Sequence, residues 1–296
     1  MSASEQEQWT VLRLLEWTTD FFKQRGSEAP RLDAEVLLAH ARECSRVELY
    51  TAFADVPSDE QRIAFRELVL RRGEGMPVAQ LVGYREFYSL RFRVNESVLI
   101  PRPETEHVVI EALDCAKEMQ ISARPLQIAD VGTGSGAIAV TLAKHLPNAK
   151  VTAIDESDEA LKIAIWNAEE HQVESQISFI DGDLLAAVQS PEKFDLICSN
   201  PPYISEAEFA ELPKTVRDYE PRGALVSGPD GTEVIKRLLG ESYNRLHGGG
   251  RLIIELSPMI ADACADLAGQ ISELTDLRFI KDLAGHRRVM SLRRVS

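Results

Sequence analysis

The sequence is poor in cysteine, has no long apolar run and carries no excess of basic residues. Its 296 residues include four cysteines that lie far apart and form no Cys-x-x-Cys pair: Cys44, Cys115, Cys198 and Cys264. This spacing argues against a zinc site or a disulfide framework, so free thiols in a reducing, cytoplasmic compartment are expected. No stretch approaches the roughly 18 uninterrupted apolar residues of a membrane span, and the polar N-terminus does not resemble a secretory signal. No membrane association is expected.

The charge balance excludes one broad class of function. Lys and Arg number 33 against 47 Asp and Glu, a formal net charge of −14. Unspecific binding of nucleic acid depends on clustered cationic side chains, so an acidic chain is a poor candidate for it. The apolar fraction of 44% is ordinary for a globular protein, and the length predicts two domains.

Residues 1–83 have a helical pattern throughout. Ser58, followed three residues later by Gln61, predicts the capped start of one helix. Pro30 introduces an earlier one. The first helix is predicted from apolar residues on a single face: Val11, Leu14, Leu15, Thr18 and Phe22. We therefore predict a small N-terminal helical bundle.

Over residues 84–99 the spacing of apolar residues changes from the helical pattern to the alternation of strands. Apolar residues there mostly alternate with polar ones, which predicts short strands, with a turn at Asn95-Glu96-Ser97. We interpret this segment as a β-hairpin linker between the bundle and a second domain over 100–296.

From residue 126 onward, apolar β-branched runs alternate with helical patterns. The first four of these runs lie at 126–131, 151–154, 177–180 and 194–198, and a fifth lies at 252–256. Strands that are buried on both faces and separated by helices predict a parallel, doubly wound sheet. Leu277–Leu283 and Val289–Leu292 predict a C-terminal antiparallel hairpin. The expected sheet is therefore seven-stranded and mostly parallel.

A glycine-rich loop follows the first of these strands. Glycine occupies alternate positions, which lets the backbone turn tightly and approach a ligand closely. The loop reads Gly132, Thr133, Gly134, Ser135 and Gly136. Such a loop is a weak signal by itself, because dinucleotide-binding enzymes use a related pattern.

Carboxylates at the ends of the next two strands strengthen this signal. Asp155 ends the second strand, where it could accept hydrogen bonds from both ribose hydroxyls of a nucleoside. Asp183 follows the third strand, where it could bind an adenine amino group. Open α/β sheets bind ligands at these strand ends. The combination resembles class I S-adenosyl-L-methionine-dependent methyltransferases.

The fourth strand runs directly into Asn200, Pro201, Pro202 and Tyr203. Two prolines fix the backbone and aim the neighbouring carbonyl groups. The Asn200 side-chain carbonyl and the Pro201 backbone carbonyl could therefore accept both hydrogens of a planar –NH2 group, while Tyr203 stacks on its face. This geometry suits methylation of an amide or an exocyclic base amine. No strong candidate for a proton acceptor is evident.

The Asn-Pro-Pro-Tyr sequence is shared by adenine-N6 DNA methyltransferases and protein glutamine-N5 methyltransferases. Neighbouring motifs resemble the second group, the peptide-chain release factor glutamine methyltransferases (PrmC/HemK). These motifs are Arg31-x-Asp33-Ala34-Glu35, Leu99 to Glu106, Tyr219-Glu220-Pro221 and Asp230-Gly231. Arg102, Glu104 and Glu106 could order the wall of the site, contact the substrate or simply cap a helix.

The resemblance implies methylation of the glutamine in the Gly-Gly-Gln motif of class 1 release factors, with S-adenosyl-L-homocysteine as the product. It implies that Gly132 to Gly136, Asp155, Asp183, Leu184 and Asn200 bind the cofactor. Asn200 to Tyr203 would bind the glutamine and carry the reaction. The helical domain would contact the release factor. We expect no metal and no direct nucleic-acid substrate, and we expect a monomer.

Three positions depart from the family pattern. Leu184 stands where the family often has an aromatic residue, and Ser257 and Ile260 stand where a Gly and a Gln often follow Glu255. Two alternative functions stay open: an adenine-N6 DNA methyltransferase, and a non-catalytic protein that retains the S-adenosylmethionine fold. The acidic charge argues against the first and the intact Asn-Pro-Pro-Tyr against the second.

Overall fold

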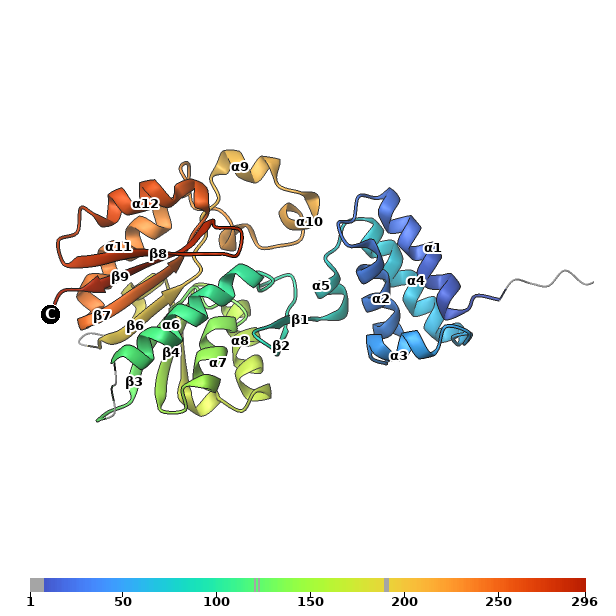
Figure 1. The fold of residues 1–296 in the computed structure, drawn as a ribbon, viewed down its shortest axis with the longest axis horizontal. Coiled ribbons are helices and arrows are strands. Elements are labelled where there is room, and N and C mark those ends of the chain that lie inside the picture. Colours follow the sequence, from blue (N-terminus) through green and yellow to red (C-terminus); the bar gives the residue numbers. More distant parts are fainter. Residues whose placement is uncertain (1–7, 120, 122, 189–191) are drawn as a thin grey trace, which may run out of the picture. The chain divides into compact units, whose positions relative to one another are not determined.

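The computed structural model describes residues 8–119, 121, 123–188 and 192–296. They divide into two compact units, residues 1–83 and 84–296, of which the first seven residues lie outside the described range. Each unit is considered by itself (Figure 1). Within the described ranges, no helix is long and apolar enough to cross a membrane.

The smaller unit is helical, as the sequence predicts. The residues expected on one face of the first helix are all buried, and Ser58 and Gln61 form the predicted capping box. Two short helices were not evident from the sequence, because six residues or fewer show little periodicity. The helices are α1 (Val11–Gln24), α2 (Pro30–Ala41), α3 (Arg46–Thr51), α4 (Asp59–Gly73) and α5 (Val78–Val82).

Charged residues of the Arg31–Glu35 motif hold this unit together. The Glu35 side chain is buried and accepts hydrogen bonds from Arg31, Arg46 and Tyr50 at 2.7, 2.8 and 2.6 Å. These bonds keep the pKa of Glu35 below its usual value despite burial. Asp33 forms an ion pair with Arg72 across to α4 at 2.9 Å. These acidic residues of the motif therefore tie the helices to one another.

A β-hairpin opens the larger unit. Its strands are β1 (Tyr84–Phe87) and β2 (Leu90–Arg93), and they are antiparallel. The predicted turn at 95–97 is present, with Ser97 N donating to Asn95 Oδ1 at 2.9 Å, but it follows the hairpin and does not close it. The chain reverses at Tyr88 and Ser89, whose φ values of 49° and 61° lie in the left-handed region that two-residue type I′ hairpin loops use. Phe87 and Phe92 are buried in the core of the larger unit, so the hairpin packs with that unit.

The central sheet has the order β5-β4-β3-β6-β7-β9-β8. Its first five members in this order are parallel, and β9 and β8 add antiparallel pairs. This arrangement confirms the predicted seven-stranded sheet. The strands are β3 (Leu126–Val131), β4 (Ala149–Asp155), β5 (Ile177–Asp181), β6 (Phe194–Ser199), β7 (Leu246–Glu255), β8 (Leu274–Lys281) and β9 (Arg287–Arg294).

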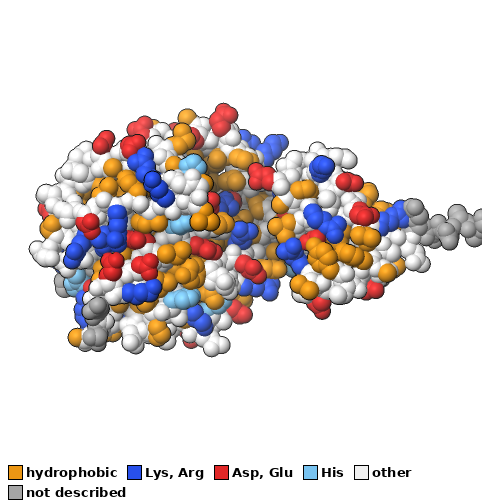
Figure 2. Space-filling model, viewed as in Figure 1, with side chains coloured by type: hydrophobic (Ala, Val, Ile, Leu, Met, Phe, Trp, Pro, Cys, Tyr) orange, Lys and Arg blue, Asp and Glu red, His pale blue; other side chains and the backbone are white. Residues whose placement is uncertain are grey.

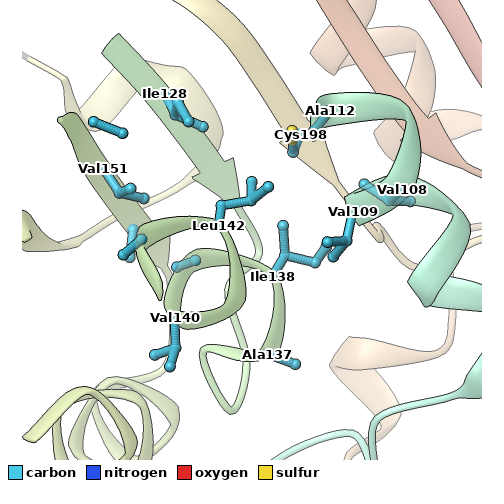
Figure 3. Packing of buried hydrophobic residues seen from close by; sticks show 14 of the residues in the cluster. Val108, Val109, Ala112, Ile128, Ala137, Ile138, Val140, Leu142, Val151 and Cys198 are labelled. Carbon is cyan, nitrogen blue, oxygen red and sulfur yellow. The ribbon is translucent and has the colours of Figure 1, made fainter. Parts of the chain in front are cut away.

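Helices cover both faces of the sheet (Figure 1). Successive strand residues enter opposite cores: Ile128 packs with the first set of helices and Ala129 with the second. In Figure 3 the side chains of α6, α7, β3 and β4 converge in the first core. The first set is α6 (Glu106–Met119), α7 (Ala137–His145) and α8 (Asp158–Glu170), and the second is α11 (Glu233–Arg245) and α12 (Ala261–Ala268).

A long segment separates β6 from α11 and folds back on itself. Its backbone joins Ile204 to Leu225 and Ser227 through hydrogen bonds of 3.0 and 2.9 Å. It contains α9 (Glu206–Glu211), α10 (Lys214–Arg217) and the 3-10 turn η4 (Arg222–Ala224). The other 3-10 turns are η1 (Pro103–Thr105), η2 (Glu174–Gln176), η3 (Leu184–Ala187) and η5 (Pro258–Ile260).

Asn167 of α8 joins the hairpin to the glycine loop. Its fully buried side chain accepts a hydrogen bond from Arg93 N at 2.7 Å. It donates to Arg93 O at 3.1 Å and to Ser135 O at 2.8 Å. One side-chain amide thus forms hydrogen bonds with three backbone groups, two in the hairpin and one in the glycine loop.

We predict that Asn167→Ala lowers the free energy of unfolding by about 3 kcal/mol or more, because three buried backbone groups lose their partners. The exposed Glu169→Ala on the same helix is the control and should change it by less than about 0.5 kcal/mol. Chemical denaturation measures both. Equal effects of the two substitutions would contradict this role of Asn167.

Candidate active site

The predicted site residues come together at the carboxyl-terminal edge of the sheet, where the parallel strands end. Val131, which ends β3, pairs with Ile154 of β4 on one side and with Ser199 of β6 on the other. The glycine loop therefore lies between Asp155 and Asn200. Glu255 ends β7, beyond β6. Because chain order reverses between β3 and β6, this is the switch point at which open α/β sheets bind ligands.

A cavity of about 350 Å³ lies at this edge. Its walls are formed by the glycine loop, the ends of β4 and β5, the start of the segment after β6, and two loops distant in sequence. The lining residues include Val98, Pro101, Thr105, Gly132, Gly134, Asp155, Asp183, Leu184, Asn200, Pro202, Pro221, Ala224 and Arg237. Pro221 lines it, although only the family resemblance singled out this residue in the sequence.

The glycine loop has the backbone conformation that glycine permits. Gly132, Gly134 and Gly136 have φ values of 71°, 55° and 80°, in the left-handed region. A Cβ on Gly132 or Gly134 would meet no atom within 4 Å, so these residues leave their side of the cavity open. A Cβ on Gly136 would lie 3.1 Å from Ala164 Cβ, so that glycine serves the packing of α8.

Beneath the loop lies the buried carboxylate of Asp130. It accepts hydrogen bonds from Thr133 Oγ1 at 2.6 Å and from Ala139 N at 3.0 Å. Burial raises the pKa of Asp130 to about 7 despite these bonds. Thr133 and Ser135 are buried and line the cavity. The loop is therefore held from below by Asp130 and from the side by Asn167.

Asp155 lies beside the glycine loop. Its two carboxylate oxygens accept hydrogen bonds from Gly134 N at 2.8 Å and from Ser157 N at 3.0 Å. These bonds fix the orientation of the carboxylate at the cavity wall. Burial raises the pKa of Asp155, and the two N–H groups partly offset the rise.

Asp183 lies at the cavity with a partner that was not evident from the sequence. Its carboxylate forms an ion pair with Arg237 of α11 at 2.6 Å, and about half of each side chain is exposed. Leu184 follows with a φ of 49°, uncommon for a leucine, and lines the cavity. Their roles in cofactor binding stay predictions.

The amide of Asn200 has a defined orientation. Its Nδ2 donates a hydrogen bond to Thr105 Oγ1 at 3.0 Å, which leaves Oδ1 as the end able to accept hydrogen bonds from a ligand. Asn200 and Pro202 line the cavity. Pro201 is buried, and neither it nor Tyr203 is among the lining residues.

A buried carboxylate lies behind the Asn-Pro-Pro-Tyr segment. Glu255 accepts a hydrogen bond from the Tyr203 hydroxyl at 3.2 Å. It is 1% exposed, and burial raises its pKa to about 7. Burial also raises the pKa of Tyr203. Neither Thr105 nor Glu255 was predicted as a site residue, because no local spacing links Thr105 to Asn200, 95 positions away, or Glu255 to Tyr203, 52 positions away.

Glu220 fixes the loop that carries Thr105. One of its oxygens lies 2.5 Å from Arg102 Nη2, and the other accepts from Ile100 N at 3.2 Å. Of the open alternatives for Arg102, this geometry supports ordering of the wall. Glu106 accepts from Tyr88 N at 2.9 Å and joins the same loop to the hairpin.

Comparison with known proteins identifies the family of this chain. Residues 13–83 match the family described as PrmC N-terminal domain, and residues 111–215 match the methyltransferase small domain. The chain is 61% identical over 287 residues to the release factor glutamine methyltransferase of Rhodopirellula baltica, covering 97% of each. It is 42% identical over 285 residues to the protein of that name from Chlorobaculum tepidum, covering 94% of this chain and 95% of the relative. The chain belongs to the release factor glutamine methyltransferase family.

Solved structures agree on the fold. A methyltransferase from Pyrococcus furiosus, 18% identical, matches with a TM-score of 0.51 over 77% of this chain and 98% of its own. The larger unit therefore has the class I methyltransferase fold. Among the described residues, no group of three or more His, Cys, Asp or Glu side chains could hold a metal ion.

Two of the three departures from the family pattern have a local structural role. The Ser257 hydroxyl accepts a hydrogen bond from Met259 N at 3.3 Å and caps the turn η5. Ile260 packs into the core between the sheet and α12.

Gly231, in the Asp230-Gly231 motif, approaches Tyr203 so closely that a Cβ on Gly231 would lie 2.7 Å from the Tyr203 carbonyl oxygen.

The two kinds of glycine predict different effects of alanine. Gly134→Ala should weaken S-adenosylmethionine binding and lower the free energy of unfolding by only about 1 kcal/mol, the strain of the left-handed backbone. Gly136→Ala should lower it by about 1–3 kcal/mol more, because its Cβ would meet α8. Calorimetric titration and chemical denaturation separate the two effects. The distinction fails if both variants are destabilised equally.

Proposed function

We propose that this protein methylates the side-chain amide nitrogen of the glutamine in the Gly-Gly-Gln motif of class 1 release factors. The observation that carries the proposal is the orientation of Asn200, whose Nδ2 is held by Thr105 while the residue lines the cavity. The names of the relatives support the same substrate. S-adenosyl-L-methionine is the methyl donor, and S-adenosyl-L-homocysteine is the product.

The residues at the cavity fit this cofactor. Gly132 and Gly134 leave open space where side chains would stand, and the fixed carboxylate of Asp155 suits ribose hydroxyls. Apolar side chains such as Leu184 and Ile138 offer a surface for a flat base. Asp183 completes the predicted cofactor set. When bound, the cofactor supplies a methyl group on a positively charged sulfur.

The Asn-Pro-Pro-Tyr segment binds the glutamine in this proposal. Asn200 Oδ1 and the Pro201 carbonyl accept the two N–H bonds of the substrate amide and hold its nitrogen in place. Their partial negative charges also stabilise the positive charge that develops on that nitrogen during transfer. Pro202 fixes the backbone, and Tyr203 packs against the amide.

The proposal extends to the remaining predictions. The helical unit is proposed to recognise the release factor, and the protein to act as a monomer in the cytoplasm, where translation terminates. Nucleic acid is not the proposed substrate. On the face in Figure 2, Lys and Arg side chains are interspersed with Asp and Glu side chains.

We predict that Asn200→Ala lowers the rate of methyl transfer at least about a hundredfold, the loss typical of removing one preorganised hydrogen-bonding group. Cofactor affinity should change little. Asn148→Ala is the matched control, because Asn148 is exposed immediately before β4 at the opposite edge of the sheet. Initial rates with radiolabelled cofactor measure the loss, and full activity of Asn200→Ala would refute the amide-binding role.

The substrate is tested by offering the protein labelled S-adenosylmethionine with either a class 1 release factor or duplex DNA. Label is expected on the release factor alone, and replacing the glutamine of its Gly-Gly-Gln motif should abolish it. Label on DNA and none on the release factor would favour the adenine methyltransferase. Label on neither, with cofactor bound, would favour a non-catalytic protein.

A further inference from the structure

The turn after β5 is the part of the cavity wall that carries Asp183 and Leu184. Leu184 lines the cavity with a φ of 49°, in the left-handed region that a leucine rarely adopts. A backbone conformation of this kind persists only where the surroundings fix it. The sheet supplies one such contact, because Gly182 N donates to Asp155 O at 3.0 Å. Further contacts come from a helix that is distant in sequence.

Two charged residues of α11, one helical turn apart, contact this turn. Arg237 Nη2 donates to Asp183 Oδ2 at 2.6 Å, and Glu241 Oε2 accepts from Leu185 N at 3.0 Å. Arg237 Nη2 also lies 3.8 Å from Glu241 Oε1, because side chains four positions apart project from the same face of a helix. The helix α11 therefore binds the turn twice, through a side chain before Leu184 and through the backbone after it.

The contact with Arg237 leaves one oxygen of the Asp183 carboxylate available. Asp183 lines the cavity and precedes η3 without capping it, and among the described residues its Oδ1 takes part in no hydrogen bond. A carboxylate oxygen is only an acceptor, so it suits an N–H donor such as the amino group of adenine and disfavours the carbonyl group of hypoxanthine. Because Oδ2 is bound to the guanidinium, rotation of the carboxylate is restricted.

We propose that Arg237 and Glu241 are positioning residues that hold the turn 183–185 for recognition of the adenine amino group of the cofactor. The inference rests on the proposed role of Asp183 in binding adenine, and it assigns selection of the base to a pair of residues on α11. Asp183 and Arg237 are each about half exposed, so their ion pair contributes little to stability. Its loss should therefore weaken binding of the base and leave folding intact.

The first test compares S-adenosylhomocysteine with its hypoxanthine analogue, S-inosylhomocysteine, by calorimetric titration. The unsubstituted protein should bind the adenine compound at least about tenfold more tightly, because the analogue cannot donate to the carboxylate. Arg237→Gln should weaken binding of the adenine compound about three- to tenfold and that of the analogue less than about twofold.

Lys236→Gln is the matched control, because Lys236 is exposed on the same helix and its substitution removes the same charge. It should leave both affinities unchanged. An equal loss for the two compounds in Arg237→Gln would overturn the proposal. Tighter binding of the adenine compound would also overturn it, because Arg237 would then compete with the base for Asp183.

The second test asks whether Arg237 acts through Asp183. A residue that acts only through another has no effect once that other residue is removed. Added to Asp183→Ala, Arg237→Gln should therefore change the affinity for S-adenosylhomocysteine by less than about twofold. Additive losses would contradict the positioning role.

The same variants separate this inference from the proposal on which it rests, and neither measurement requires a methyl acceptor. If Asp183→Ala changes neither the affinity nor the preference for adenine, the proposed cofactor role of Asp183 fails, and the positioning role fails with it. If Asp183→Ala abolishes the preference and Arg237→Gln leaves it unchanged, the role of Asp183 stands and that of Arg237 fails.

The third test concerns Glu241. Glu241→Gln keeps an oxygen that can accept from Leu185 N, whereas Glu241→Ala does not. The alanine variant should bind S-adenosylhomocysteine at least about threefold more weakly, and the glutamine variant should stay within about twofold of the unsubstituted protein. Circular dichroism establishes that both variants are folded. Equal affinities of the two variants would overturn the role of Glu241.

Discussion

The site depends on one pairing, the parallel ladder between β3 and β6. These strands are separated by more than 60 residues, yet Val131 and Ser199 lie side by side, and the Ser199 hydroxyl donates to the Val131 carbonyl at 2.7 Å. Both strands end at this point. The glycine loop and the Asn-Pro-Pro-Tyr segment therefore start from adjacent positions, as the proposed cofactor and substrate sites require.

Rigid partners hold each of these loops. The glycine loop is bound by Asp130, Asp155 and Asn167, and the Asn200 amide is bound by Thr105. The loop that carries Thr105 is in turn bound by Glu220. A methyl transfer requires the accepting nitrogen to be held close to the methyl carbon in a defined direction. The buried carboxylates supply that order, and the raised pKa values of Asp130 and Glu255 are the consequence of burying them.

The order of the strands along the sheet also separates two tasks. Asp183 and Asp155 follow β5 and β4 on one side of the glycine loop, and Asn200 and Glu255 follow β6 and β7 on the other. The carboxylates proposed to bind the cofactor and the segment proposed to bind the glutamine thus lie on opposite sides of the glycine loop.

Much of this arrangement could be predicted from short-range patterns in the sequence. Periodicity located the helix from Val11 and the strands of the larger unit, and the glycines and prolines marked both loops, because these signals depend on neighbours within a few positions. The hairpin turn was misplaced, since Tyr88 and Ser89 adopt left-handed conformations without the Gly or Asn that usually indicates them.

The sequence alone thus determined the fold class, the family resemblance and the two loops that form the site, because backbone restrictions are carried by single residue types. Only the tertiary structure decided that Arg237 pairs with Asp183, that Glu220 holds Arg102, and that Thr105 holds the Asn200 amide. These contacts join positions that are 54, 118 and 95 residues apart, and no local pattern specifies them. They exist because the sheet brings the ends of distant strands to a single edge.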